Sequence, residues 1–489
     1  MKSDKGIILI LLIIFLCILP FFYLHQGLLL IDTGREFYIP QQIISGNVLY
    51  KDIFNIYGAL SYQINALLFL IFGQKISVLA LGGVFNSIII LITGYFLSRE
   101  FLNKSISFLY SLVICFALIF QTFLYNSNFP YSFAITYALS SFLLSLLFLI
   151  KYTKTQKSCF MYISCFFAGI SIANKYEFIL YPVILAYVLK DTGLKNGIKA
   201  LICFICAPLI SYSLLIFQGL NLNDVKISIE LINNLINAPL IKQFFYKTSL
   251  NVLNNGISGI FAVLPVINII LLFIKRNEII KNKPLFILIL SAIVSCFKSF
   301  FVLNVNHMGI FLFPLCFLAF LAILNIKYQK FIPFILTACI LIFSAGDFYS
   351  LEQKDYFLIT PKGDIYTYKK DGDLINQAAG YIFENTKDTD RVVIMPEGSI
   401  INFITDRKGD NMYYNLSPLF YYDVFGEKRI IEHFSKNLPE YFVILPIDNR
   451  EYGFSFFGKD YAQNFYEMIL QNYNLVFNKN GVKIFKINS

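Results

Sequence analysis

Long apolar runs recur along the chain from residue 7 to about residue 346. A helix that crosses a bilayer needs about 20 predominantly apolar residues, and the pattern predicts about eleven such spans. They lie at about 7–25, 76–97, 106–124, 130–150, 158–173, 176–189, 200–218, 250–273, 285–303, 308–326 and 331–346. The pattern therefore predicts an α-helical polytopic membrane module over residues 1–346.

From about residue 347 the hydropathy falls, and strand-like and helical patterns alternate up to residue 489. The apolar runs RVVIMP and YFVILPI predict short buried strands. DLINQAAGYIFENT and DYAQNFYEMILQNY predict amphipathic helices, and NLVFNKNGVKIFKI predicts a terminal hairpin around Asn480-Gly481. We therefore expect a small α/β domain over residues 347–489.

Composition and charge agree with a membrane protein and indicate its orientation. The chain is 57% hydrophobic and 14% charged, whereas soluble domains carry about 25% charged residues. Basic residues gather in alternate connections between the spans, which predicts that these connections are cytoplasmic. They are Lys2, Lys5, Arg99, Lys104, Lys151, Lys154, Lys157, Lys190, Lys195, Lys199, Lys275, Arg276, Lys281, Lys283, Lys327 and Lys330. An odd number of spans then places the loop at 26–75 and the 347–489 domain outside.

The net charge of +10 is explained by this topology, because the excess of basic residues lies in the predicted cytoplasmic connections. The domain at 347–489 is mildly acidic, and we expect no nucleic-acid partner. All nine cysteines precede residue 347. A cysteine-free outer domain fits a bacterial exported domain at least as well as a eukaryotic one, and we expect a multi-pass protein of the bacterial inner membrane.

Two outer loops have patterns typical of helices. Within the loop at about 26–75, YGALSYQINALLFLIFG places apolar and aromatic residues at helical spacing, which predicts one or two helices in the membrane interface. Tyrosines such as Tyr50 and Tyr57 suit the headgroup level. A second loop at about 219–249 is also amphipathic and could form a second lid, although both loops could simply cap the bundle.

Asp32 is the strongest candidate for chemistry. It directly follows the first span, and Glu36 lies four residues later, so the two share a face if the segment is helical, with Arg35 beside them. Asp52 follows about twenty residues later. Partial desolvation raises the pKa of a carboxylate at the bilayer boundary and makes it a better general base. An ordinary solvated carboxylate is the alternative, which we slightly favour for Asp52.

Candidate cations lie on the same side. Lys175 and Glu177 occupy a very short outer turn, where opposite charges near hydrocarbon must be paired or used. Lys175 either pairs with its neighbour or holds an anionic lipid headgroup. Lys298 lies deeper, within reach of the outer boundary, and His307 begins the next span. A single histidine is more often structural than a ligand.

These residues together suit a lipid-phosphate substrate that enters from the membrane. Cations would hold the phosphate while a carboxylate deprotonates an incoming hydroxyl or amine. A lipid-linked sugar is a sensible donor there, because nucleotide sugars are not supplied outside the cell. Asp32, Glu36 and Asp52 could hold a divalent metal through oxygen ligands, although such carboxylates are more often metal-free, and we assign no metal ligand and no required cofactor.

The order of these motifs resembles the GT-C superfamily of membrane glycosyltransferases. The closer likeness is to the glycosyltransferase 39-like branch, which contains protein O-mannosyltransferases and lipid A aminoarabinose transferases. The resemblance rests on Asp32-Thr-Gly-Arg35-Glu36, Gly46-Asn-Val-Leu-Tyr50-Lys-Asp52, Tyr57-Gly58-Ala59-Leu60, GISIANKYEF, and His307 leading to Pro314. It covers roughly the first 350 residues.

The resemblance implies inverting transfer of a sugar from a polyprenyl phosphate on the outer face of the membrane. Asp32 would match the catalytic acidic residue, with Glu36 as a candidate second carboxylate. Lys175 would match a position near the lipid phosphate, with Arg35, Lys298 and His307 as further candidates. Two positions depart from the pattern, since Thr33 stands where many relatives have a second acidic residue, and Ala59 stands where they have proline.

The expected partners are a polyprenyl-phosphate sugar, membrane lipids, and a glycan, lipid or protein acceptor. Asp52, Tyr57 and Glu177 are candidate supporting residues. Arg407, Tyr413 and Tyr414 could line a glycan surface, but folding explains them equally well. The competing functions are a transporter or flippase for lipid-linked glycans, and a scaffold or sensor. Transport predicts charges near the bilayer midplane and internal repeats, and we find no internal repeat.

Overall fold

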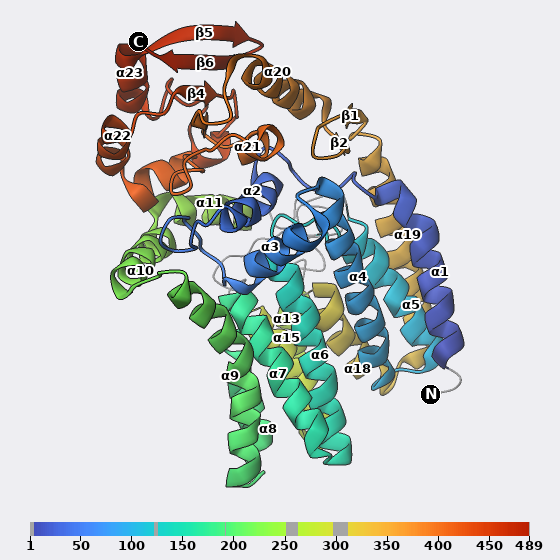
Figure 1. Ribbon diagram of the computed structural model, residues 1–489. Helices are drawn as coiled ribbons and strands as arrows, with labels where there is room; N and C mark the ends of the chain where they lie inside the picture. Colours follow the sequence, from blue (N-terminus) through green and yellow to red (C-terminus); the bar gives the residue numbers. More distant parts are fainter. Residues whose placement is uncertain (1–3, 122–125, 191, 251–262, 297–311, 489) are drawn as a thin grey trace.

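The computed structural model describes residues 4–121, 126–190, 192–250, 263–296 and 312–488. In them a bundle of apolar helices carries a small sheet-containing domain on one end (Figure 1). Helices α2 (Asp32–Ile44) and α3 (Leu60–Phe72) lie between the bundle and that domain. The predicted architecture, a helical membrane module with a small C-terminal α/β domain, is confirmed.

Apolar helices occupy the described parts of the predicted spans. The elements are α1 (Asp4–Phe22), α4 (Ile76–Arg99), α5 (Lys104–Ile114) with η1 (Cys115–Ile119), α6 (Phe133–Thr155), α7 (Ser158–Asn174), η2 (Tyr176–Phe178), α8 (Tyr181–Leu189), α9 (Leu194–Phe217), α13 (Leu264–Ile274), α14 (Arg276–Lys281), α15 (Lys283–Ser295), η4 (Leu312–Phe317), α18 (Leu318–Asn325), η5 (Gln329–Phe331) and α19 (Ile332–Leu351). Five helices in the described ranges are long and apolar enough to cross a membrane: α1, α4, α6, α9 and the continuous helix that ends in α19.

Small residues hold α7 close to its neighbours. The Ser171 hydroxyl donates to the carbonyl of Ala138 on α6 at 2.9 Å. On the side that faces α9, a Cβ added at Gly169 would lie 1.9 Å from the carbonyl oxygen of Phe204. Serine and glycine permit this close approach of helices. The packing fixes the end of α7, which Lys175 directly follows.

The loop between α1 and α4 contains two helices. α3 covers the segment whose apolar spacing predicted a helix, and α2 begins at Asp32. The second amphipathic loop also forms helices, α10 (Leu222–Asn237) and α11 (Pro239–Leu250). α10 reaches the C-terminal domain, because the Asn234 side-chain amide donates to the carbonyl of Val424 at 3.2 Å.

The C-terminal domain has a two-stranded and a four-stranded sheet. Strands β1 (Tyr356–Leu358) and β2 (Ile365–Thr367) pair antiparallel, and the larger sheet has the order β3-β4-β6-β5. The other elements are β3 (Val392–Met395), β4 (Tyr441–Ile444), β5 (Tyr473–Lys479), β6 (Val482–Ile487), α20 (Lys369–Asn385), α21 (Ser399–Thr405), η6 (Leu419–Phe425), α22 (Glu427–Lys436), η7 (Arg450–Tyr452) and α23 (Gln463–Asn472).

The strands expected from apolar runs are β3 and β4, which pair in parallel and are buried throughout. The expected helices are α20 and α23. The hairpin of β5 and β6 turns at Asn480-Gly481, whose φ angles of 49° and 85° are those of a two-residue turn that needs positive φ at both positions. These local predictions are confirmed.

The C-terminal domain shares an aromatic core with the α2–α3 layer. The Phe403 ring of α21 lies 5.2 Å from the Phe37 ring of α2 and 5.7 Å from the Phe69 ring of α3. Burial of such rings contributes strongly to cohesion. The α19 helix continues past the predicted boundary at residues 346 and 347, so the position of that boundary stays a prediction.

Candidate functional site

Asp32 occupies the first turn of α2, and Arg35 lies one turn later. One guanidinium nitrogen, Nη1, lies 2.9 Å from Oδ1 of Asp32. The Asp32 side chain is 27% exposed and that of Arg35 only 9%. The helix N-terminus favours an acidic residue at this place. Asp32 is therefore oriented by an ion pair while its side chain stays partly exposed.

Thr33 has a structural task in the turn before α2. Its hydroxyl accepts a hydrogen bond from the amide of Leu28 at 2.9 Å, and its own amide donates to the carbonyl of Leu28 at 3.0 Å. Threonine thus closes the turn that leads from α1 to Asp32. The position that the resemblance associates with a second acidic residue is buried and used for folding.

Glu36 is buried beneath Arg35 and is held by two donors. Its Oε1 accepts from the Tyr62 hydroxyl at 2.8 Å, and its Oε2 accepts from the amide of Phe133 at 2.9 Å. Phe133 is the first residue of α6, whose amide has no partner within the helix. Burial raises the pKa of Glu36, and the Arg35 charge and both donors oppose that rise. These contacts are those of a structural carboxylate, and the catalytic role of Glu36 stays a prediction.

Tyr57 reaches the site because Gly58 lets its loop pack against the end of α7. The Gly58 amide donates to the carbonyl of Asn174 at 3.0 Å, and a Cβ added at Gly58 would lie 2.0 Å from the carbonyl oxygen of Ala173. Such an approach of two backbones requires glycine. The Tyr57-Gly58 motif therefore has a steric cause.

Lys175 is 3% exposed and is surrounded by aromatic and acidic groups. Its Nζ donates to the Tyr131 hydroxyl at 2.8 Å and lies 3.6 Å from Oε1 of Glu177. It also lies 4.5 Å from the centroid of the Tyr57 ring. A buried ammonium is costly unless such groups compensate for lost water. The pairing with Glu177 matches one of the two predicted roles of Lys175. Binding of an anionic headgroup stays a prediction.

Arg35 shares the same two rings with Lys175. Its Cζ lies 5.3 Å from the Tyr57 centroid and 6.0 Å from the Tyr131 centroid, and its Nη2 donates to the Tyr57 hydroxyl at 3.2 Å. The faces of aromatic rings attract cations, but two cations on the same rings repel each other. Asp32 and Glu36 lie beside Arg35, and Glu177 lies beside Lys175, so three carboxylates balance the two cations.

The remaining predicted residues are placed differently. Asp52 accepts a hydrogen bond from the amide of Val48 at 2.9 Å, which closes a turn before α3. Lys298 and His307 lie outside the described residues. Arg407 donates to Thr386 and Thr405 and forms an ion pair with Asp388, so its contacts are those of a folding residue. Tyr413 packs among the rings of Phe425, His433 and Phe434.

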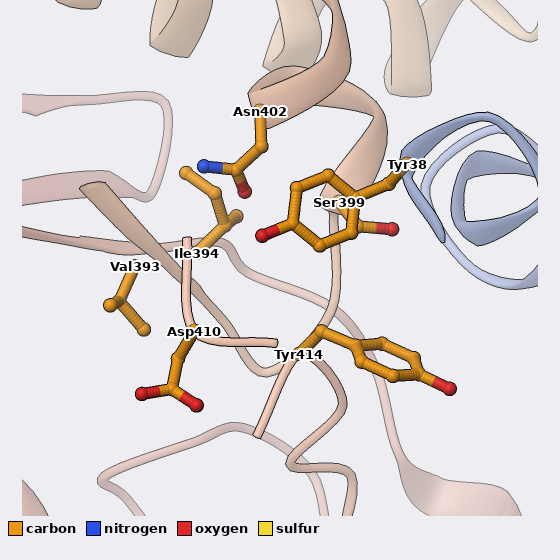
Figure 2. Close-up of a pocket in the computed structure, with 7 residues that line it drawn as sticks. All are labelled: Tyr38, Val393, Ile394, Ser399, Asn402, Asp410 and Tyr414. Atoms are coloured by element: carbon orange, nitrogen blue, oxygen red, sulfur yellow. The ribbon is translucent and has the colours of Figure 1, made fainter. Parts of the chain in front are cut away.

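The C-terminal domain closes over α2 from one side. The Tyr38 hydroxyl donates to Oδ1 of Asn411 at 2.6 Å and accepts from the amide of Gly409 at 3.2 Å. Figure 2 shows a small cavity whose lining includes Tyr38 of α2 and Ser399, Asn402 and Tyr414 of the C-terminal domain. Its volume of ≈ 10 Å³ is at the lower limit for one water molecule, about 10–15 Å³. This cavity is a packing gap and does not hold a sugar.

Two residues of the site escaped prediction. Tyr131 lies at the short connection before α6, 96 positions from Arg35, to which its carbonyl is bonded. Its sequence signal was only an aromatic residue at the start of a span. Glu397 belongs to the C-terminal domain and follows the buried strand β3. A polar residue after the carboxyl end of a predicted strand, in the run Met395-Pro-Glu397-Gly398, was the available signal.

In the ranges that the structure describes, no group of three or more His, Cys, Asp or Glu residues is arranged to hold a metal ion. The carboxylates proposed as oxygen ligands are already engaged by other groups. Asp32 pairs with Arg35, Glu36 accepts from Tyr62 and Phe133, and Asp52 accepts from Val48.

Solved structures share this fold. ArnT from Cupriavidus metallidurans in the apo state superposes with a TM-score of 0.57 at 10% identity, covering 99% of this chain and 98% of ArnT. The same ArnT bound to undecaprenyl phosphate gives a TM-score of 0.57 at 10% identity, with 98% of each chain covered. The Archaeoglobus fulgidus oligosaccharyltransferase in complex with Zn and sulfate gives 0.54 at 14% identity, covering 88% of this chain and 67% of the other.

No family model matches the sequence, and no curated protein matches it. The likeness is therefore one of fold. ArnT and the archaeal oligosaccharyltransferase AglB have the GT-C fold. The fold expected from the sequence resemblance is thus confirmed, over nearly the whole chain in the case of ArnT.

Proposed function

We propose that this protein is a glycosyltransferase that moves a sugar from a polyprenyl-phosphate-linked donor to an acceptor hydroxyl or amine. The observation that carries the proposal is the pair of buried cations, Arg35 and Lys175, that share two aromatic rings beside an accessible Asp32. The GT-C fold adds support, because ArnT has been solved with undecaprenyl phosphate bound. The acceptor is a glycan, a lipid or a protein.

In the proposed reaction, Asp32 acts as the general base. Its carboxylate takes the proton from the acceptor O–H or N–H, and the acceptor atom forms a bond to the anomeric carbon of the sugar. The bond between that carbon and the phosphate oxygen breaks, and its electron pair leaves with the polyprenyl phosphate. Attack from the face opposite the phosphate inverts the anomeric configuration.

Arg35 and Lys175 would hold the donor phosphate and stabilise the negative charge that grows on it as the bond breaks. Tyr57 would hold both cations through its ring, and Glu177 would orient Lys175. Lys298 and His307, outside the described residues, stay candidates for the same phosphate. Glu36 would maintain the start of α6 and the position of Arg35, and it stays a candidate second carboxylate.

The proposed reaction takes place on the outer face of a bacterial inner membrane. The basic residues between spans support a cytoplasmic N-terminus, which puts the α2–α3 loop and the C-terminal domain outside. Asp32 would then lie at the outer membrane surface, within reach of a polyprenyl-phosphate donor in the bilayer and of a polar acceptor from the aqueous side.

Purified full-length protein, undecaprenyl-phosphate sugars with a labelled sugar, and a cell-envelope fraction as acceptor source test the proposal. We expect label to move from the donor to an acceptor and free undecaprenyl phosphate to appear in equal amount. A parallel reaction with a chelator decides whether a divalent metal is needed. Donor that crosses a vesicle bilayer without losing its sugar would instead identify a flippase and overturn the proposal.

A further inference from the structure

Lys354 is a buried cation that the proposed reaction does not use. It lies between α19 and β1, and it is 1% exposed. Its Nζ donates to the carbonyl of Gly27 at 2.7 Å, across 327 positions of the chain. A lysine near the end of a membrane span ordinarily extends its ammonium into water, and burial of that charge is costly without compensating contacts. The place of Lys354 therefore indicates a specific task at Gly27.

The acceptor of Lys354 is the peptide group between Gly27 and Leu28, and that group is held at both ends. Its carbonyl oxygen accepts from Lys354, while its N–H, which belongs to Leu28, donates to the hydroxyl of Thr33 at 2.9 Å. The amide of Thr33 in turn donates to the carbonyl of Leu28 at 3.0 Å. A carbonyl that accepts from a cation polarises its peptide group and strengthens the bond made by the N–H. One peptide group thus separates Lys354 from Thr33, the neighbour of Asp32.

The turn before α2, residues 27–33, is also anchored on its other side. Gly27 holds a φ of +88°, and a Cβ added there would lie 2.8 Å from Oγ1 of Thr33. The preceding residue, Gln26, is 1% exposed, and its Nε2 donates to two backbone carbonyls at the end of η1, at 3.0 and 2.6 Å. Gln26 therefore fixes the turn to the helix bundle, and Lys354 fixes it to the segment that enters the C-terminal domain.

The turn and the first turn of α2 move as one unit, because Gly34 packs against both sides. A Cβ added at Gly34 would clash with the carbonyl oxygen of Leu29, in the turn, and would lie 3.0 Å from the backbone nitrogen of Ile400. Asp32 stands between these two close approaches. A displacement of the turn therefore passes directly to Asp32, and a misplacement of about 1 Å in a catalytic group can lower a rate about 10²-fold.

A ring and a carboxylate help to keep the buried ammonium charged. Its Nζ lies 5.2 Å from the centroid of the Tyr368 ring, whose face attracts cations. Burial lowers the pKa of Lys354 to about 8, and the charge of Asp371 opposes that fall. The side chain is therefore an ammonium at neutral pH, and its bond to Gly27 is a charge-assisted one.

We propose that Lys354 is a positioning residue for Asp32, on which it acts through the turn before α2. The inference rests on the proposed function, and it gives the segment after the last membrane span a part in aligning the general base. Lys354 does not touch the substrate. Its hydrogen bond fixes the turn, and the turn fixes the direction in which the carboxylate of Asp32 points.

Hydrogen exchange of the turn is the first measurement, in the full-length wild type, in Lys354→Met and, as a matched control, in Lys369→Met. Lys369 also lies near a tyrosine ring, with Nζ 5.4 Å from the centroid of Tyr356, but its side chain is 74% exposed. We expect the amides of Leu28 and Thr33 to exchange about tenfold faster in Lys354→Met, because one hydrogen bond to a charged group is lost. Exchange in Lys369→Met should match the wild type.

Sugar transfer is the second measurement. We expect Lys354→Met to lower kcat by about 10- to 100-fold. The affinity for undecaprenyl phosphate should stay close to that of the wild type, because the rings that hold Arg35 and Lys175 belong to other elements. A loss of donor affinity as large as the loss of kcat would show a general structural role and would overturn the inference.

Thr33→Val tests the same connection from the other end of the peptide group. Valine has the shape of threonine without the hydroxyl, so the N–H of Leu28 loses its acceptor. If Lys354 acts through this peptide group, the variant with both substitutions should lose little more kcat than the more impaired single variant. Losses that multiply would overturn the inference. If Lys354→Met does not fold, a wild-type kcat in Thr33→Val would overturn it instead.

Hydrogen exchange needs no sugar donor, so it separates this inference from the proposed function. Faster exchange in Lys354→Met together with an inactive wild type would reject the glycosyltransferase, and with it the alignment of a general base, but would keep the hold of Lys354 on the turn. An active wild type whose exchange and kcat do not respond to Lys354→Met would reject the role of Lys354 alone.

Discussion

Arg35 and Lys175 lie over the same pair of rings, with Lys175 Nζ 4.5 Å and Arg35 Cζ 5.3 Å from the centroid of Tyr57. They come from two elements, the first turns of α2 and the turn after α7. The two like charges are balanced by the carboxylates of Asp32, Glu36 and Glu177. Under the proposed function, the affinity for an anionic lipid phosphate should depend on both cations.

We predict that Lys175→Met lowers the affinity for undecaprenyl phosphate by about 10- to 100-fold, because a hydrogen bond to a charged group contributes roughly 1.5–3 kcal/mol. Lipid binding measured by thermal shift or by titration in detergent checks this. Lys151→Met is the matched control. Lys151 also lies over two aromatic rings, those of Phe96 and Phe148, but near the C-terminal end of α6, away from Tyr131. Equal affinities for the wild type and the Lys175 variant would remove Lys175 from the phosphate site.

We predict that Asp32→Asn lowers sugar transfer by about 10²- to 10⁴-fold, the usual contribution of a general base. The side chains are nearly isosteric, so the variant should fold, and it should still bind undecaprenyl phosphate. Initial rates with labelled donor measure the effect. Asp373→Asn on the exposed face of α20 is the control. Transfer near the wild-type rate by Asp32→Asn contradicts the proposed role of Asp32.

Substitutions of Glu36 can decide whether its role is structural or catalytic. Glu36→Leu leaves the Tyr62 hydroxyl and the Phe133 amide without their acceptors. We expect a loss of about 1–3 kcal/mol for each buried group that is left without a partner, seen as a lower unfolding temperature in detergent. Glu36→Gln keeps an acceptor oxygen and should lose less. If Glu36→Gln has the stability of the wild type and no transfer activity, Glu36 is catalytic rather than structural.

Gly58→Ala should push the loop that carries Tyr57 away from the end of α7, which Lys175 follows. The added Cβ would meet the carbonyl oxygen of Ala173 at 2.0 Å, and both are backbone-fixed, so the Tyr57 loop must move away from Lys175. We expect weaker lipid binding together with lower thermal stability. Gly380→Ala in α20 is the control, because nothing lies within 4 Å of its added Cβ. That substitution should be neutral or stabilise by about 0.4–1 kcal/mol.

The raised pKa of Glu397 has a consequence for stability. Its value of about 8 lies above the ordinary 4.5, so between these pH values the folded protein holds a proton that the unfolded chain has lost. Stability associated with this group is therefore fully present below pH 4.5 and declines as pH rises through about 8. Glu397→Gln should remove this decline, whereas the control Glu432→Gln, at an exposed position on α22, should keep it. Thermal unfolding across that pH range measures the difference.

The local pattern of the chain predicted much of the fold. Helices such as α4 and α6 follow directly from long apolar runs, because hydrocarbon demands that every backbone group be paired within the segment. The β5–β6 hairpin follows from Asn480-Gly481, because few other residue pairs adopt positive φ twice in succession. α2 was harder to predict, because its polar sequence fits either a helix or a loop. The structure shows a helix that begins at Asp32.

The chain pattern by itself determined which residues carry charge at the end of the bundle: Asp32, Arg35, Glu36 and Lys175 stand out because charges beside apolar spans are rare. Only the tertiary structure decided how they are used. It buries Glu36 under α6, places Arg35 and Lys175 on the same rings, and brings Tyr131 and Glu397 to Asp32. Such partners lie far apart in the chain, and the close approaches at Gly34 and Gly58 that join them leave no periodic signal in the sequence.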